Sequence, residues 1–237
     1  MPSLVEKIWR THRVAVSQPG NSGLVATTPG GADLIAIDRI FLHERTGSIA
    51  LKSLESDQRR VRSRSRVFCT MDHIVDTFPG RSDQTLMPSG HLFIQATRES
   101  AHAAGIKLFD LDDLDQGIAH VISPEQGIAL PGVTLVCPDS HTGTLGGLGA
   151  LAWGIGSSEA EHALATNTLR VSKPKTMRVT FTGELSNGAT SKDMILHLIG
   201  QYGASGGLGY AVEFAGRVDG ILRVRNRVQR DVGVGAP

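Results

Sequence analysis

The chain has 237 residues, of which 40% are hydrophobic and 20% charged, so it can bury a substantial core and has an ordinary globular composition. Its 24 lysines and arginines balance 23 aspartates and glutamates, and the net charge of +1 provides no overall field to attract nucleic acid or an anionic membrane. No stretch has the apolar length of a transmembrane helix or of a signal peptide, which predicts a cytoplasmic protein without a membrane partner.

The first third of the chain alternates ordered segments with loops. A short amphipathic start is followed at residues 17–33 by a stretch rich in Gly, Pro, Ser and Thr, which predicts an exposed loop. Order resumes at the apolar run LIAIDRIFL. Five arginines within residues 59–66 have a density that suits phosphate binding, but no aromatic residue between them would stack on bases. A solvated loop is therefore favoured there over a nucleic-acid site.

Helical and strand patterns alternate through the rest of the chain. A helix is predicted over 90–104 with Leu92, Phe93, Ala96 and Ala103 near one face, and Gly105 stands where a C-cap belongs. The runs IKLFDL, GVTLVC and TMRVTFT are typical of strands. Further helices are expected over about 157–169, where Ser158 and Glu161 have capping-box spacing, and from residues 190–193 to Gly200. This alternation predicts an α/β fold.

Two cysteines occur, Cys69 and Cys137, each inside an apolar run. Two such distant thiols exclude a disulfide framework and a closed zinc or iron–sulfur site. We expect each to be a small buried side chain rather than a ligand or a nucleophile.

Three histidines follow strand-like or loop segments: His73 in TMDH, His120 in GIAH and His141 in PDSHT. Two of them have a neighbouring aspartate, Asp72 or Asp139, which suits general acid–base chemistry because a carboxylate fixes the tautomer of an imidazole and raises its basicity. Polar residues at the carboxyl ends of strands are where an open α/β sheet collects ligands. A satisfied loop histidine is the alternative for each.

Other site types have weaker support. No G-x-S-x-G segment surrounds Ser140, which disfavours a hydrolase, and no H-E-x-x-H pair supports a metal site. The glycine-rich segments GTLGGLGALAWGIG and GASGGLGY lack dinucleotide-binding spacing. Carboxylate binding or close backbone packing fits these glycines better.

The segment VCPDSHTGTLGGLGALAWGIGSSEAEHALATNTL resembles the signature of the aconitase superfamily, in particular the large subunits of 3-isopropylmalate dehydratase. The segments VEKIW, AIDRIFLHE, TMDHIVDT, QGIAHVISPEQGIALPG, KTMRVTFTGEL and TSKDMILHLIGQYGASGGLGYAVEFAG resemble the same family in the same order. The resemblance covers residues 1–216 and implies an aconitase-like fold of three-layer α/β/α domains with mostly parallel sheets, here incomplete. Residues 217–237 form a divergent arginine-rich tail, and charge alone supports nucleic-acid binding at 217–230.

The resemblance implies a hydro-lyase that eliminates and re-adds water on a 2-hydroxy dicarboxylic acid such as 2- or 3-isopropylmalate, in leucine biosynthesis. It implies a [4Fe–4S] cluster as Lewis acid and a separate small subunit as partner. Asp72 and His73 resemble the family's pair near the departing hydroxyl, with His73 as proton donor, and His120 with Asp139 resembles a second pair.

A third pair, His141 with Glu213, and two substrate contacts, His43 and Ser140, are implied in the same way. Two departures limit this resemblance. Residues 45–51 differ from the segment that helps to choose the substrate side chain, so a 2,3-dimethylmalate-type dehydratase is a rival, whereas Thr144 disfavours a citrate enzyme.

The second departure concerns the cluster. The family's cluster cysteines follow the VEF motif, and no cysteine follows Cys137 here. We therefore expect a fragment that lacks the cluster ligands and is inactive alone. The alternative is a non-catalytic remnant that binds a dicarboxylate or docks on another subunit.

Overall fold

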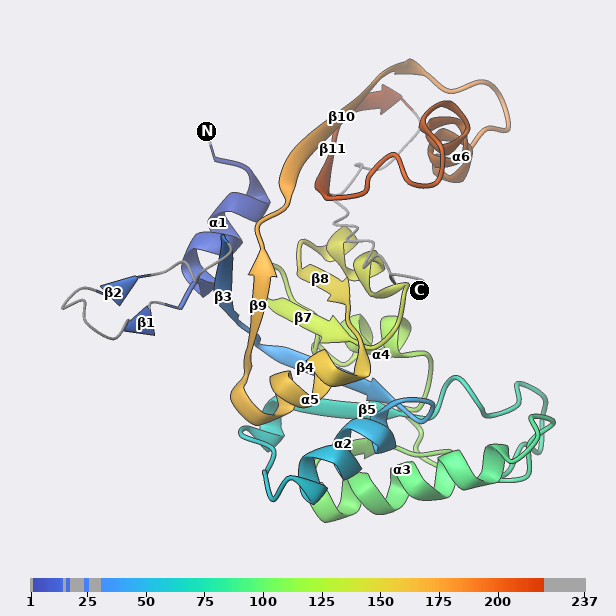
Figure 1. The fold of residues 1–237 in the computed structure, drawn as a ribbon. Coiled ribbons are helices and arrows are strands. Elements are labelled where there is room, and N and C mark those ends of the chain that lie inside the picture. The colour runs from blue at the N-terminus through green and yellow to red at the C-terminus, as the bar shows by residue number, and fades with distance from the viewer. Residues whose placement is uncertain (1, 15, 18–23, 26–30, 220–237) are drawn as a thin grey trace.

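The computed structural model describes residues 2–14, 16–17, 24–25 and 31–219. Figure 1 shows the order of its helices and strands. Most of the expected loop at 17–33, and residues 220–237 of the expected tail, lie outside the described residues. Within the described ranges, no helix has both the length and the apolar character needed to cross a bilayer.

A five-stranded parallel sheet forms the centre of the molecule, in the order β6-β5-β4-β7-β8. The strands are β4 (Arg39–His43), β5 (Val67–Thr70), β6 (Lys107–Phe109), β7 (Thr134–Cys137) and β8 (Leu151–Gly154). The β4 residues Ile40, Phe41 and Leu42 are fully buried, as expected for a central strand covered on both faces. This explains why LIAIDRIFL is almost continuously apolar.

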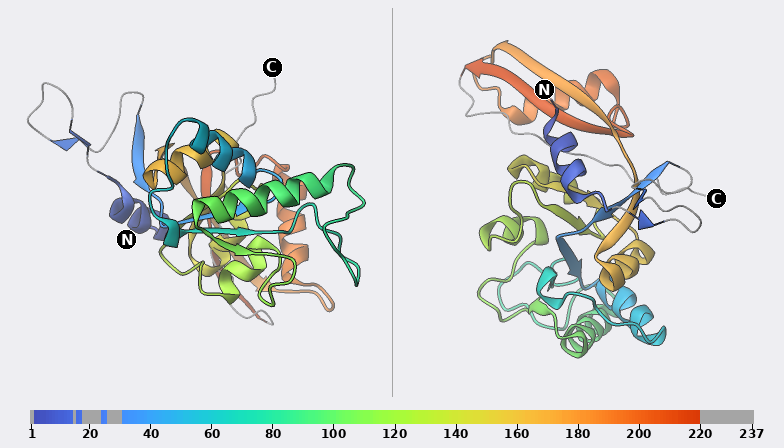
Figure 2. Two further views of the ribbon diagram at one scale, coloured as in Figure 1. Left: turned by 90° about the horizontal axis from the view of Figure 1, so that it is seen from below. Right: turned by 90° about the vertical axis from the view of Figure 1, so that its left-hand side faces the viewer.

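Helices cover both faces of this sheet, as the two views in Figure 2 show. The covering elements are α2 (Gly47–Ser56), α3 (Gly90–Ala104) and α5 (Ser157–Thr166) on one face, and α4 (Ala119–Glu125) and the 3-10 helix η2 (Thr142–Leu148) on the other. Ile40 and Leu42 pack with Leu51 and Leu164 in one core cluster, whereas Phe41 packs with Ile122 in a second. These two cores confirm the expected three-layer α/β/α arrangement.

Helix α3 has the predicted bounds, and Gly105 follows it with φ +66° as a C-cap. The predicted buried face is wrong, because Leu92 is exposed and the buried stripe is instead Ile94, Thr97 and Ala101. Thr97 is buried because its hydroxyl donates a hydrogen bond of 3.2 Å to the Glu44 carbonyl oxygen. A buried face predicted from apolar residues alone leaves out the polar Thr97.

Two other helices differ from their predictions: α5 starts at the predicted residue 157 but ends at Thr166 and has another cap, and α6 ends later than expected. Helix α5 begins after Gly156, whose N–H donates to the Glu159 side chain at 3.1 Å, so the predicted Ser158–Glu161 capping box is wrong by two residues. Glu161 instead accepts a hydrogen bond of 2.7 Å from the Ser53 hydroxyl. Helix α6 (Ser191–Tyr202) continues through the expected stop at Gly200 and ends before Gly203.

The remaining elements lie outside the central sheet. Strands β3 (Ala32–Ala36) and β9 (Thr168–Ser172) pair antiparallel, α1 (Leu4–His12) buries Val5, Ile8 and Trp9, and β1 (Val16–Ser17), β2 (Leu24–Val25) and the 3-10 helix η1 (Arg64–Arg66) are short. All five arginines of residues 59–66 are exposed, as expected for a solvated loop. Cys69 and Cys137 are free and fully buried, as predicted.

The last described part is a parallel β-α-β unit of β10 (Lys175–Glu184), α6 and β11 (Tyr210–Asp219). It lies at one end of the molecule, next to α1 (Figure 1). The alternation predicted for TMRVTFT is confirmed, because Met177, Val179 and Phe181 are half-buried and their neighbours are more exposed. β11 runs to Asp219, so the first three residues of the expected tail belong to a strand.

Candidate active site

The candidate site lies at the carboxyl edge of the central sheet. His43 is the last residue of β4, the Asp72–His73 pair follows β5, and Asp139 follows β7. Strands β5 and β6, which follow β4 in the sequence, lie on one side of it. The later strands β7 and β8 lie on the other side, so the strand order reverses beside β4. Ligands of open α/β sheets bind at such switch points, and five of the eight predicted site residues meet here: His43, Asp72, His73, His120 and Asp139.

Asp139 connects two histidines. Its Oδ1 accepts hydrogen bonds of 2.6 Å from His120 Nε2 and 2.7 Å from the His141 backbone N–H, and its Oδ2 accepts one of 3.1 Å from His73 Nε2. The bonds from His120 and His73 hold the pKa of Asp139 well below its ordinary value. Asp139 is therefore a carboxylate anion at neutral pH, and the predicted His120–Asp139 pair is formed.

His73 lies between two carboxylates. Its Nδ1 is 2.6 Å from Asp72 Oδ1, and its Nε2 is the donor to Asp139. The hydrogen bonds to Asp139 and Asp72 raise the pKa of His73 to about 10, although burial opposes the shift. The ring is thus an imidazolium at neutral pH. The second Asp72 oxygen accepts a 2.8 Å bond from the Ala119 N–H at the start of α4, which fixes the carboxylate.

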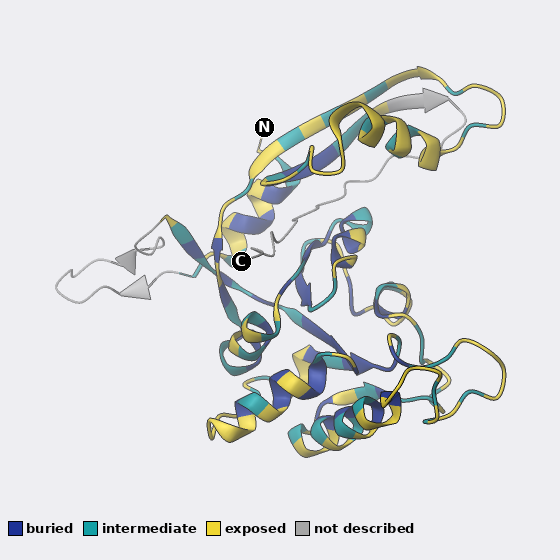
Figure 3. Ribbon diagram, turned by 45° about the vertical axis from the view of Figure 1, so that its right-hand side comes forward, coloured by how far each residue is buried: buried dark blue, intermediate teal, exposed yellow. Residues whose placement is uncertain are grey.

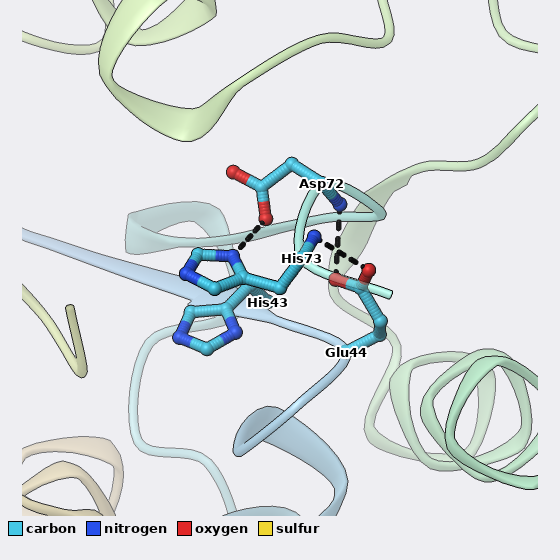
Figure 4. A group of neighbouring side chains, drawn as sticks. All are labelled: His43, Glu44, Asp72 and His73. Carbon is cyan, nitrogen blue, oxygen red and sulfur yellow. Dashed lines mark hydrogen bonds and ion pairs between the residues drawn. The ribbon is translucent and has the colours of Figure 1, made fainter. Parts of the chain in front are cut away.

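His43 is stacked on His73, with ring centroids 3.8 Å apart and planes inclined by 14° (Figure 4). Its Nε2 donates to the Pro138 carbonyl oxygen at 2.9 Å, and burial lowers the pKa of His43, so the ring is neutral. Its Nδ1 is then a buried lone pair that has no hydrogen-bond partner among the described residues. His120 Nδ1 is also buried and unpartnered in the described part of the chain.

A glycine allows the Asp139 loop to come close to the sheet. A Cβ on Gly154, the last residue of β8, would lie 2.5 Å from the Asp139 carbonyl oxygen. Any larger residue would displace the loop that carries Asp139. Close packing is therefore the role of this glycine in the segment GTLGGLGALAWGIG.

His141 and Ser140 lie at the exposed rim of the site. The His141 ring is 78% exposed, and its Nδ1 is 3.2 Å from the Ser140 hydroxyl oxygen. Both side chains can reach a ligand from the solvent side. Their predicted roles stay predictions.

Glu213 lies away from these residues, on β11. Its Oε1 accepts hydrogen bonds of 2.7 Å from the Leu4 N–H and 3.4 Å from the Val5 N–H, at the N-terminus of α1. Among the described residues, no hydrogen bond or ion pair joins Glu213 to His141. The structure therefore does not bring the predicted third pair together, and its catalytic role stays a prediction.

Glu44 is a site residue that the sequence interpretation missed. It follows His43, is fully buried, and its carboxylate accepts backbone N–H groups from the Asp72–His73 turn (Figure 4). The signal was an acidic residue in the apolar run IDRIFLHE, directly after a central strand. A carboxylate is rarely buried unless its charge is compensated, so the burial of Glu44 identifies it as a member of the site.

Comparison with known proteins shows the family of this chain. The model of the aconitase family (aconitate hydratase) matches residues 6–229. The chain belongs to the aconitase family. The 3-isopropylmalate dehydratase large subunit 1 of Bradyrhizobium diazoefficiens is 47% identical over 214 residues, or 90% of this chain and 42% of that protein. The chain thus spans less than half the length of this relative, and the family match continues past the expected boundary at residue 216.

The residues of this chain do not fit a [4Fe–4S] cluster, the cofactor that the family implies. A cluster is held by cysteine thiolates that converge on the same site. Cys69 and Cys137 are fully buried in β5 and β7, and burial raises the pKa of both thiols well above the ordinary value. The two cysteines also pack in different core clusters, on opposite faces of the sheet.

Four neighbouring side chains, His43, Glu44, Asp72 and His73, have potential ligand atoms within 4.8 Å of one another (Figure 4). Apart from His43 Nδ1, the nitrogen and oxygen atoms of these side chains already have hydrogen-bond partners. Both Glu44 oxygens accept backbone N–H groups, and both nitrogens of His73 hydrogen-bond to carboxylates. This arrangement is that of a hydrogen-bonded acid–base network.

Proposed function

We propose that this chain supplies the proton-transfer part of a hydro-lyase active site that acts on a 2-hydroxy dicarboxylic acid such as 2- or 3-isopropylmalate, together with a small subunit. The observation that carries this proposal is the His73 imidazolium held between Asp72 and Asp139 at the carboxyl edge of the sheet. Membership of the aconitase family and the name of the 3-isopropylmalate dehydratase relative support it.

His73 is suited to protonate a departing hydroxyl group. Its Nδ1 is held at 2.6 Å by Asp72, whereas its Nε2 contact with Asp139 is the longer one, at 3.1 Å. A substrate hydroxyl that replaces Asp139 as the acceptor of the Nε2 proton would also remove one of the two carboxylates that stabilise the cation. The pKa of His73 would fall and proton transfer would become easier.

Elimination also needs a group that accepts a proton from carbon. Asp139 and His120 form the second acid–base pair, at 2.6 Å, and Nδ1 of His120 has no hydrogen-bond partner among the described residues. The neutral His43 offers a lone pair beside His73. Ser140 and His141, at the exposed rim, are placed to contact a substrate carboxylate.

The chemistry of the cluster, when bound, is to polarise the substrate hydroxyl and carboxylate as a Lewis acid. The cysteines of this chain do not fit it, and we propose that its ligands lie outside these 237 residues. On this basis we expect purified chain to hold no stoichiometric iron and sulfide, and to show no turnover alone.

The proposal leaves two alternatives for the side chain of the substrate. Residues 45–51, directly after Glu44, include the first turns of α2 and differ from the isopropylmalate-type segment. A 2,3-dimethylmalate is therefore the alternative substrate. Dicarboxylate binding without turnover is the alternative function.

The test mixes the purified chain with the small subunit of a 3-isopropylmalate dehydratase and follows dehydration of 3-isopropylmalate and of 2,3-dimethylmalate. Calorimetry with the same two acids measures binding to the chain alone. An Asp139→Asn chain serves as the control, because asparagine keeps the shape and removes the anion. Turnover or binding that depends on Asp139 supports the proposal, and binding without turnover favours the remnant. Absence of heat, partner binding and turnover overturns both.

A further inference from the structure

Glu44 is a buried carboxylate whose charge is compensated by backbone alone. Its Oε2 accepts the Asp72 N–H at 2.9 Å, and its Oε1 accepts the His73 N–H at 2.7 Å, the Val75 N–H at 3.4 Å and a short bond from the Ile74 N–H. Glu44 is fully buried, and no lysine or arginine pairs with it among the described residues. Four converging N–H dipoles stabilise an anion and satisfy donors that would otherwise be buried and unpaired.

The four N–H groups belong to the turn after β5, which carries the two reactive side chains. The N–H groups of Asp72 and His73 point to Glu44, and their side chains hydrogen-bond to each other (Figure 4). The anchor itself is fixed from the other side, because the Thr97 hydroxyl of α3 donates to the Glu44 carbonyl oxygen. The position of the turn relative to β4 is therefore set by Glu44.

We propose that Glu44 is a positioning residue whose buried carboxylate holds the 72–75 turn so that His73 lies between the Asp72 and Asp139 carboxylates. Its importance for proton transfer rests on the proposed function, whereas its effect on His73 does not. Glu44 does not touch the His73 ring through a hydrogen bond, so it acts through the backbone of the turn.

A purely structural role would have a different consequence. Loss of a structural anchor would lower the stability of the whole sheet and leave His73 unchanged in molecules that stay folded. Loss of a positioning anchor changes His73 itself, because its two carboxylate contacts come from different elements, the turn and the loop after β7. The groups that face the ring are Asp72, Asp139 and His43, and Glu44 lies beneath the turn.

The experiment compares the titration of His73 by NMR in the full chain, in Glu44→Gln and in Glu161→Gln. Glu161 is a matched control, since it is also a largely buried carboxylate that accepts a hydrogen bond, on the far helix α5. We expect His73 to titrate near 10 in the unchanged chain and in Glu161→Gln. In Glu44→Gln the midpoint should fall by about 1–3 pH units, the effect of losing a neighbouring carboxylate. A folded Glu44→Gln chain with an unchanged midpoint overturns the proposal.

Amide hydrogen exchange in the unchanged chain tests the same proposal if Glu44→Gln does not fold. The amides of Asp72, His73 and Ile74 should exchange much more slowly than the exposed loop amide of Gln84. Equal exchange rates would show that the carboxylate does not hold the turn. Both measurements are made without substrate, so a failure of the proposed hydro-lyase activity would leave them interpretable.

Discussion

Two regions of this chain have the same strand–helix–strand connectivity and very different burial. In the central sheet, strands β4 and β7 are buried on both faces by helices. In the β10–α6–β11 unit, helix α6 has no buried residue, and exposed positions run along it in Figure 3. A cleft of about 780 Å³ lies between α6 and its strands, lined by apolar side chains that include Phe181, Leu198 and Phe214.

The difference shows that connectivity alone does not stabilise a β-α-β unit. Because no residue of α6 is buried, this helix adds little apolar burial to the two strands. The buried residues of β11 are Ala211, Val212 and Glu213, near the end that meets α1. The contact with α1 therefore stabilises the β10–α6–β11 unit, whereas the central sheet is stabilised by the helices packed on its two faces. The acid–base network lies in the self-sufficient region.

The largest expected effect separates the two regions by a matched pair of leucine truncations. Leu164→Ala, at a fully buried position of α5, should lower the free energy of unfolding by about 3–5 kcal/mol because it leaves a cavity in a packed core. Leu198→Ala, on half-exposed α6, should lower it by less than about 1 kcal/mol. Urea unfolding followed by circular dichroism measures both. Equal losses would mean that the β10–α6–β11 unit shares the central core.

Much of the central sheet could be predicted from the sequence, because apolar runs and glycine caps are local signals. The strands at IKLFDL and GVTLVC and the bounds of α3 follow from such signals. The buried face of α3 could not be predicted in this way, because Thr97 is buried by a hydrogen bond to a residue more than fifty positions away. The end of α6 was also missed, because Gly200 lies in an exposed helix where nothing opposes another turn.

A second, smaller effect is expected inside the network. Asp139→Ala removes the acceptor of three hydrogen bonds and leaves His73 with one carboxylate and His120 with none. We expect the free energy of unfolding at neutral pH to fall by about 2–3 kcal/mol, less than for a fully buried pair because Asp139 retains some exposure. Differential scanning calorimetry measures the loss, with Asp115→Ala in an exposed loop as control. An unchanged transition would contradict the bridging role of Asp139.

The histidine and aspartate members of the site were predictable from residue type and position after strands, but their network was not. The bond between His73 and Asp139 joins loops 66 residues apart in sequence. Glu44 was missed because its partners are backbone N–H groups, which leave no trace in residue identity. Its burial has to be seen before the acidic residue in IDRIFLHE becomes informative.

The pH dependence of stability should arise in the same region. The pKa of His73 is about 10 in the folded chain and about 6.5 in an unfolded one, so its stabilising contribution is complete below about pH 6.5 and disappears as the pH rises to about 10. Because the ring is partly exposed, we expect a loss on the order of 2 kcal/mol over this range. Unfolding of the unchanged chain and of His73→Gln at pH 6, 8 and 10 measures the difference. If the stabilities of the two chains depended on pH in the same way, His73 would not be the source of the pH dependence.

The smallest expected effect concerns the contact that joins the two regions. Glu213→Gln keeps an acceptor for the Leu4 N–H and removes the negative charge at the N-terminus of α1, which should cost about 0.5–1 kcal/mol. Faster amide exchange at Leu4 and Val5 would report it, with Glu55→Gln as a control because Glu55 is exposed on α2, away from α1. Glu213 is also predicted to act with His141 in catalysis. If Glu213→Gln lowers turnover of the assembled enzyme without loosening α1, the predicted Glu213–His141 pair forms in the assembled enzyme. The contact of Glu213 with α1 would then exist only in the isolated chain.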